Sequence, residues 1–162
     1  MSESKPQREE WFDQPNPTGE GEPDEIGLRF TCTQCGNCCT GPTGFVLFTE
    51  KEARAMSQQL GISVGAFLRD YTRETIVGRS LSEIPTEFGY DCVFLTRDAK
   101  TGKTGCSVYK SRPEQCRTWP FWRSNLKRKR DWSEASEGCP GMDQGELHNP
   151  EYIRLTRERV DI

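Results

Sequence analysis

The stretch Phe30–Cys39, FTCTQCGNCC, concentrates four of the chain's eight cysteines within eight residues. Its spacing is C-x2-C-x2-C-C, so two overlapping CxxC pairs end in a cysteine doublet. A tight turn aims both sulfurs of a CxxC pair at one ion, and thiolates are soft ligands that suit zinc, copper(I) or iron–sulfur centres. Gly36, Gly41 and Gly44 permit such turns. The stretch therefore predicts a metal-binding loop around which the fold is organised.

Four more cysteines follow at wider spacing. The full set of candidate metal ligands is Cys32, Cys35, Cys38, Cys39, Cys92, Cys106, Cys116 and Cys139. Eight sulfurs divide into two four-sulfur sites or surround a multi-atom cluster. Neighbouring side chains diverge along an extended backbone, so Cys38 and Cys39 are poorly placed to share one tetrahedral ion. The doublet is expected to serve two metal positions, unless one of its thiols has a redox or structural role instead.

The cysteine spacing leaves two metals open. Structural zinc usually takes its cysteines as two separated pairs, whereas a C-x2-C-x2-C run is more typical of a cubane ferredoxin loop. The ferredoxin pattern also needs a fourth cysteine three residues later, followed by proline, and here the Cys-Pro order occurs only at Cys139–Pro140. The cofactor prediction is an iron–sulfur cluster or Zn²⁺, near even, with a slight lean to iron.

The composition predicts a small protein with a thin core. The chain has 162 residues, 33% of them hydrophobic, and a mean hydropathy of −0.80. It has no apolar run of about 18 residues, so we expect no membrane span. The acidic start lacks the pattern of a signal or transit peptide, which predicts a cytoplasmic location. In a reducing compartment clustered cysteines bind metal more often than they form disulfides.

Charge divides the chain unevenly. Residues 1–27 contain two basic and eight acidic side chains, whereas the formal net charge of the whole chain is −3. This acidic segment, rich in Pro and Gly, is predicted to be a disordered tail. Trp11 and Phe12 interrupt it and are expected to dock on the domain or on a partner. Residues 28–162 are predicted to form one cysteine-cluster metal-binding domain.

The elements expected after the loop are short. Residues 45–48, FVLF, are an expected strand. Helices are expected after the cap residues Thr49 and Ser63, after the capping box that starts at Ser111, and after Asn149 with Pro150. A β-hairpin is expected from the arms 92–96 and 104–109, each of which carries a cysteine. The predicted fold class is α+β: a small metal-stabilised domain with a β-hairpin, several short helices and a cysteine-rich loop.

Two basic residues lie near Cys116, the third of the four widely spaced cysteines. Arg112 and Arg117 flank Cys116 and are expected to bind the cofactor through contacts to sulfur. The run Trp119–Trp132 mixes aromatic and basic residues, a combination that can bind single-stranded nucleic acid. The sequence pI of about 5.4 argues against nucleic acid and favours a protein partner or the acidic tail. The single histidine, His148, is expected to be a surface residue.

The blocks CTQCGNCC and GCSVYKSRPEQCRTWPF together resemble the YkgJ-like CxxCxxCC family, a zinc- or iron-chelating cysteine-cluster domain. The resemblance extends from Phe30 to Cys139 and implies that all eight cysteines belong to the family's metal set. It also implies that Arg112, Pro113 and Arg117 frame Cys116. A related cysteine cluster occurs in flagellin lysine N-methylases, but this chain has no Gly-rich cofactor loop after a strand.

Three functions follow from these patterns. The first is a metal-binding protein that chelates an iron–sulfur cluster or zinc through up to eight thiolates. The second is a redox or protein-modifying enzyme that uses the metal centre. The third is a zinc-stapled module that binds a protein or nucleic acid through Trp119–Trp132. A redox-active centre would distinguish the second from the first, and a salt-sensitive partner would distinguish the third.

Overall fold

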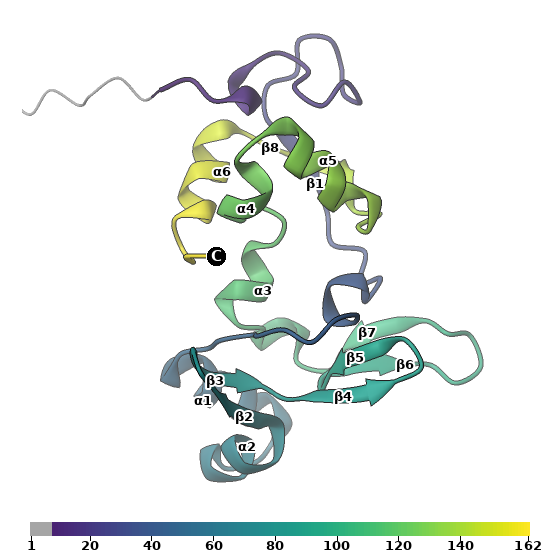
Figure 1. Cartoon of the computed structure of the whole chain (residues 1–162), viewed down its shortest axis with the longest axis vertical. Coiled ribbons are helices and arrows are strands. Elements are labelled where there is room, and N and C mark those ends of the chain that lie inside the picture. Colours follow the sequence, from purple (N-terminus) through teal and green to yellow (C-terminus); the bar gives the residue numbers. More distant parts are fainter. Residues whose placement is uncertain (1–7) are drawn as a thin grey trace, which may run out of the picture. The chain divides into compact units, whose positions relative to one another are not determined.

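The computed structural model describes residues 8–162 and divides them into two compact units (Figure 1). Unit 1 joins residues 8–31 to Pro120–Ile162, and unit 2 is the continuous segment Cys32–Trp119. Both units mix short helices with antiparallel strand pairs, which confirms the predicted α+β class. No helix within residues 8–162 is long and apolar enough to cross a membrane.

Unit 2 is built from three α-helices, two 3-10 turns and three hairpins. Each hairpin forms its own two-stranded antiparallel sheet. The elements are η2 (Asn37–Cys39), α1 (Glu50–Leu60), α2 (Val64–Tyr71), β2 (Thr72–Thr75), β3 (Gly78–Leu81), β4 (Glu83–Thr86), β5 (Gly89–Cys92), β6 (Leu95–Arg97), β7 (Thr104–Cys106), η3 (Tyr109–Ser111) and α3 (Glu114–Thr118).

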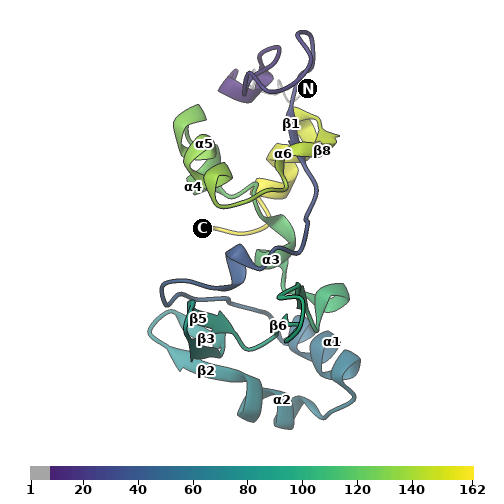
Figure 2. The same ribbon diagram turned by 90° about the vertical axis from the view of Figure 1, so that its right-hand side faces the viewer.

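Unit 1 brings the two ends of the chain together. Strand β1 pairs antiparallel with β8 and is interrupted by an irregularity between Arg29 and Phe30; the two strands lie side by side in both views (Figures 1 and 2). The elements are η1 (Trp11–Asp13), β1 (Leu28–Phe30), α4 (Arg123–Leu126), α5 (Lys129–Glu137), β8 (Met142–His148) and α6 (Pro150–Arg157).

Three of the four predicted helix caps are confirmed. Thr49 Oγ1 accepts the backbone N–H of Glu52 at 3.2 Å while the Glu52 carboxylate accepts that of Thr49 at 2.6 Å, a capping box that starts α1. The Ser63 side chain accepts the Ala66 N–H at the start of α2, and the Asn149 side chain accepts the Tyr152 N–H at the start of α6. The fourth prediction is wrong: Ser111 ends η3, and α3 begins after Pro113 with no side-chain cap. Each cap supplies a partner for a backbone donor that the first helical turn leaves unpaired.

The core of unit 2 is an aromatic stack enclosed by α1. Phe67 and Phe94 are buried and nearly parallel, with ring centroids 6.2 Å apart, and Tyr71 stacks on Phe94 at 5.2 Å. Ala53 and Met56 of α1 pack against the same cluster. The half-buried Cys92 and Cys106 lie at its edge, so the core directly supports the strands that carry two of the thiols.

The core of unit 1 uses the aromatic residues of the basic run. Phe121 and Trp132 are buried and stack at 5.9 Å, and Phe30 meets Phe121 edge to face at 6.1 Å. Residues 127–130, KRKR, are exposed. Phe121 and Trp132 are therefore unavailable for stacking on bases, because packing within unit 1 already covers both rings.

The structure departs from the sequence expectations in three further places. Residues 45–48 form no strand; Leu47 makes a single bridge to Ser80. Cys92 lies on the hairpin β4–β5, opposite Glu83, whereas Cys106 lies on β6–β7. Of the predicted disordered tail 1–27, residues 1–7 lie outside the described residues, and residues 8–27 follow a defined path in which Phe12 is fully buried. Burial of that aromatic ring offsets the entropy cost of ordering the segment.

Asp143→Asn is expected to stabilise unit 1 slightly at neutral pH. Asp143 accepts the Trp132 indole N–H at 2.8 Å, and burial raises the pKa of its carboxyl. Because the folded pKa lies above the unfolded value, ionised Asp143 opposes folding once the pH exceeds the folded pKa. An amide keeps the acceptor without the charge, so Tm should rise by about 1–2 °C, allowing for solvent screening.

The Asp143 effect has a pH signature. The advantage of the Asn variant should shrink as the pH falls through the folded pKa and vanish below the ordinary carboxyl value of 3.8, where the wild-type group is protonated in both states. Thermal unfolding across pH, with the exposed Asp24→Asn as the matched charge change in the same unit, measures it. An equal shift in both variants would show that net charge, and not burial, is responsible.

Candidate metal centre

The cysteine run lies on unit 2 as a loop beside β5 and β7 (Figure 1). Its first part is tied to the strand that ends at Cys106, because the Thr104 hydroxyl donates to the Gln34 carbonyl at 2.7 Å. Gly36 starts the 3-10 turn η2 at φ +78°, where a Cβ would lie 3.0 Å from Leu95 Cδ1. This glycine therefore provides both the left-handed turn and the close approach of the loop to the β6–β7 hairpin.

The second part of the loop is tied to the strand that ends at Cys92. The Thr40 hydroxyl donates to the buried carboxylate of Asp91, which also accepts two hydrogen bonds from Arg97 at 3.1 and 3.2 Å. The Tyr90 backbone N–H donates to the Gly41 carbonyl at 2.8 Å. A Cβ on Gly89 would meet that same carbonyl at 2.5 Å, so the crossing requires glycine.

A third set of contacts positions Cys116. Its neighbour Gln115 pairs with the extended segment after the loop: the side-chain oxygen accepts the Leu47 N–H at 2.9 Å and the amide nitrogen donates to the Phe45 carbonyl at 2.8 Å. Glu52 of α1 accepts the Glu114 N–H at 2.5 Å at the start of α3. The start of α3, which carries Cys116, is thereby held to the segment after the loop and to α1.

The eight cysteines differ in solvent exposure. Cys38 is exposed, whereas the other seven cysteines are half-buried, and all eight are free thiols. The Sγ atoms of Cys38 and Cys39 lie 3.7 Å apart. The hydrogen bond between them lowers the pKa of Cys38 to about 7 and raises that of Cys39. The doublet thus presents one exposed thiol that ionises readily and one that keeps its proton.

Four thiols from four different elements act on one another electrostatically. They are Cys38 of the loop, Cys92 of β5, Cys106 of β7 and Cys116 of α3. Burial is the main cause that raises the pKa of Cys92 to about 11 and of Cys116 to about 12, and it also raises that of Cys106. Repulsion between the charged forms adds to each shift, and every pair within the four contributes.

One cation serves this group. Arg112 Nη1 lies 4.0 Å from Cys32 Sγ, and its guanidinium stacks over the Tyr109 ring at 3.8 Å from the centroid. Its positive charge adds to the lowering of the Cys38 pKa that the hydrogen bond from Cys39 causes, and it partly opposes the rise that burial causes in the pKa of Cys106 and Cys116. The other predicted residue, Arg117, is exposed, and its ion pairs are with Glu114 at 2.7 Å and Glu52 at 3.9 Å.

The last predicted ligand belongs to unit 1. Cys139 follows the end of α5, where its backbone N–H donates to the Ser136 carbonyl at 3.1 Å. His148 is also in unit 1; its Nε2 lies 2.9 Å from the Phe30 carbonyl and its ring stacks on Tyr152. Unit 2 therefore holds seven of the eight cysteines. Within residues 8–162, no three Cys, His, Asp or Glu side chains already converge on one point at ligand distance.

The donor set nevertheless fits a soft metal. Thiols that repel one another when ionised, with a guanidinium beside them, are the environment in which a metal cation replaces several protons. A family model described as "Putative zinc- or iron-chelating domain", CxxCxxCC, matches residues 31–140, a range that includes all eight cysteines. The chain belongs to the CxxCxxCC family. This confirms the resemblance inferred from the two sequence blocks.

This CxxCxxCC chain is similar to a curated protein over part of its length. "Uncharacterized protein MJ0661" of Methanocaldococcus jannaschii is 35% identical over 95 residues, which are 59% of this chain and 46% of that protein. The match thus spans less than half of the relative's length. No solved structure matches the chain.

Sequence reasoning missed the residues that hold the family's cysteines in place. Asp91, Gln115 and Thr104 each stand next to, or two residues from, a cysteine and reach back to the loop. Adjacency of a polar residue to Cys92, Cys106 or Cys116 was the available signal. It was weak, because such neighbours are usually solvated and their partners lie about 50 to 70 positions away.

Gln115→Ala is expected to loosen the anchor of Cys116. The variant leaves a donor at Leu47 and an acceptor at Phe45 without their partner, which should cost about 1–2 kcal/mol of unfolding free energy. Metal affinity should fall several-fold, because a less fixed thiol must be ordered on binding. Urea unfolding and metal competition test both effects. Gln58→Ala, an exposed glutamine on α1, is the control and should change neither quantity.

Proposed function

We propose that unit 2 chelates its metal through Cys38, Cys92, Cys106 and Cys116, and that the metal is an iron–sulfur cluster or zinc. The observation that carries this grouping is that all six pairs among these thiols influence one another's ionisation. Each thiol comes from a different element, so one metal centre would join the loop, two hairpins and α3. The C-x2-C-x2-C run adds a slight preference for iron.

The chain's own residues prepare this site in three ways. The loop is held over β5 and β7 by Thr40, Asp91 and Thr104, which brings Cys38 toward the other three thiols. Arg112 favours the thiolate forms that a metal requires. When bound, zinc would supply a redox-inert cross-link, whereas an iron–sulfur cluster would add one-electron chemistry.

The remaining cysteines form the second part of the proposal. Cys39 interacts electrostatically with Cys38, Cys92 and Cys116, so it is the alternative fourth ligand if the doublet shares its duties. Cys32 lies beside Arg112, and Cys35 belongs to the same loop. A second centre would draw on these thiols. The doublet was predicted to serve two metal positions because its side chains would diverge, but its Sγ atoms lie 3.7 Å apart, close enough to share one ion.

The first experiment is metal and acid-labile sulfide analysis with an absorption spectrum, on full-length protein purified without oxygen. Iron with sulfide and a brown colour would identify a cluster, and redox titration would then test whether the protein transfers electrons. Colourless protein with one or two zinc ions per chain would identify a structural site. Protein that binds neither metal in reconstitution would contradict the proposed function.

The grouping of the thiols needs its own test. Serine variants of Cys38, Cys92, Cys106 and Cys116 are each expected to lose the same centre, seen as a loss of stoichiometry or of thiolate-to-cobalt charge-transfer absorption in the cobalt-substituted protein. Cys139→Ser is the matched control in unit 1. If Cys139→Ser loses that centre and Cys106→Ser keeps it, the grouping is wrong even though the protein binds metal.

A further inference from the structure

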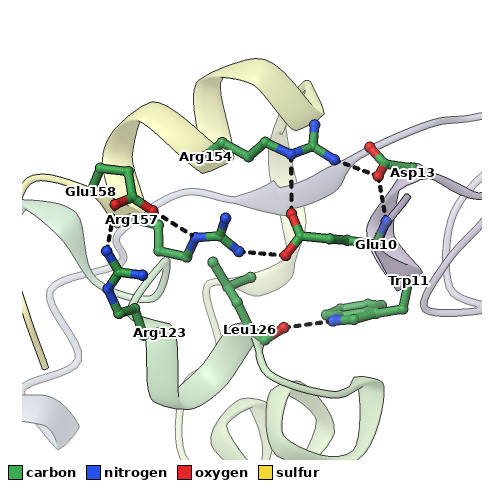
Figure 3. Close-up of polar contacts among 8 residues, drawn as sticks. All are labelled: Glu10, Trp11, Asp13, Arg123, Leu126, Arg154, Arg157 and Glu158. Atoms are coloured by element: carbon green, nitrogen blue, oxygen red, sulfur yellow. Dashed lines mark hydrogen bonds and ion pairs between the residues drawn. The ribbon is translucent and has the colours of Figure 1, made fainter. Parts of the chain in front are cut away.

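The segment Glu10–Asp13 has the form of a bound peptide ligand on unit 1 (Figure 3). It folds into a single 3-10 turn, η1, closed by its own atoms: the Asp13 carboxylate accepts the Glu10 N–H at 2.6 Å, and the Asp13 N–H donates to the Glu10 carbonyl at 3.0 Å. The following residues form a loop, and its two ends are joined by a hydrogen bond in which the Asn16 N–H donates to the Glu25 carbonyl at 2.7 Å. The turn is therefore a compact element on a tether.

The two aromatic residues of this segment, Trp11 and Phe12, pack against the rest of unit 1. Phe12 is completely buried, and Trp11 contacts both Phe12 and Trp132, with ring centroids 5.6 and 6.3 Å away. The Trp11 indole N–H donates to the Leu126 carbonyl at 2.8 Å. Leu126 ends α4, so the indole supplies a partner for a carbonyl that a helix end leaves unpaired. An aromatic body with one polar contact is a common anchor in recognition sites.

The acidic residues that flank this aromatic pair form ion pairs with two arginines of α6. Arg154 pairs with Glu10 at 3.0 Å and also with Asp13, and Arg157 pairs with the other Glu10 oxygen at 2.6 Å (Figure 3). The arginine side chains are only 17% and 18% exposed. Within residues 8–162, both ion pairs of Arg154 are with this segment. Without it, two partly buried guanidinium groups one turn apart would repel each other.

We infer that α4, α5 and α6 of unit 1 form a recognition site for an acid–aromatic–aromatic–acid peptide, and that the chain's own Glu10–Asp13 is its exchangeable occupant. The site has the parts such a role requires: a cavity for one aromatic ring, a main-chain acceptor for an indole, and two arginines spaced to meet two carboxylates. A second polypeptide with the same pattern would bind by replacing the resident segment. The inference concerns unit 1 alone and is independent of the metal.

The test cuts the tether in the folded protein. A site-specific protease sequence is inserted between Gly19 and Glu20, in the exposed turn of the loop, where a Cβ on Gly19 would meet nothing within 4 Å. After cleavage, the fragment with Trp11 and Phe12 is expected to co-elute with the body on size exclusion. A fluorescein-labelled peptide of residues 8–14 should then replace it, seen as a rise in anisotropy.

Charge-reversed probes test recognition by the arginines. A probe with Glu10→Lys and Asp13→Lys should bind at least about tenfold more weakly than the unchanged probe. A probe with Glu9→Lys is the matched control, since Glu9 is exposed and bonds only to Gln14 within the segment; it should bind within about twofold of the unchanged probe. Equal binding of the two variants would overturn the inference.

Three further outcomes would also overturn it. Separation of the fragment from a body whose circular dichroism and melting are unchanged would show that the site does not hold it. The second outcome is a body that unfolds on cleavage, and the third is a fragment that stays bound without ever exchanging with the probe. Either result would make the segment an integral part of the fold and not a ligand.

Discussion

Removal of the metal from the purified protein is expected to unfold much of unit 2. A centre with thiolate ligands from the loop, β5, β7 and α3 would cross-link four elements, and the core beneath them is small. In zinc-finger peptides metal binding contributes about 10–16 kcal/mol to folding. Unit 2 has an aromatic core of its own, so we expect a smaller loss, on the order of 5 kcal/mol, still the largest single effect on this protein.

Hydrogen exchange after chelation measures this loss by region. Backbone amides of β4–β5 and β6–β7 should lose protection, whereas those of β1–β8 in unit 1 should change less. Three of the four tryptophans, Trp11, Trp122 and Trp132, belong to unit 1, so tryptophan fluorescence follows mainly that unit. Chelator already saturated with zinc is the control. Unchanged protection and Tm after the metal has left would show that the centre does not hold the fold together.

Phe67→Ala is expected to cost about 3–5 kcal/mol of unfolding free energy. Phe67 is completely buried and touches three other rings: it stacks on Phe94 and Tyr71 and meets Phe48 edge to face at 5.7 Å. Truncation removes the apolar area and leaves a cavity in a core with few other large side chains. Metal affinity should fall as well, because Cys92 and Cys106 pack against this cluster.

Phe88→Ala is the matched control for this core variant. Phe88 is 54% exposed near the turn of β4–β5, where Arg97 stacks over its ring at 4.2 Å. The loss of that contact should cost less than about 1 kcal/mol. Urea unfolding of the two variants in the metal-free and metal-bound protein measures the difference. A Phe67→Ala variant no weaker than Phe88→Ala would mean that the aromatic stack contributes little to stability.

The features that the sequence predicted correctly are those decided by neighbouring residues. Thr49 with Glu52, Ser63, and Asn149 with Pro150 mark helix starts because a cap and its backbone donor lie within one turn. The metal-binding character of the cysteine run was likewise predicted from eight neighbouring residues. Together with the block around Cys116, the run was enough to recognise the family.

Errors arose where pairing across the chain overrode a local pattern. The apolar run 45–48 has the composition of a strand. Its backbone groups, however, pair with the Gln115 side chain and make isolated contacts with Ser80 and Leu81, so no continuous strand pairing forms. Cys92 was assigned to the wrong hairpin because β4, the partner of β5, includes Pro85 and is weakly apolar. Both outcomes depend on which segment lies opposite, and a single sequence does not state that.

The sequence by itself determined the chemistry of this protein: eight soft ligands, their spacing, and the caps that start its helices. Tertiary structure decided which thiols influence one another's charge, since Cys38, Cys92, Cys106 and Cys116 come from the loop, two separate hairpins and a helix. It also decided that Phe12 is buried and that Arg154 binds acids more than 140 positions away. Ligand type is a property of single side chains, whereas proximity is produced only when the whole chain packs.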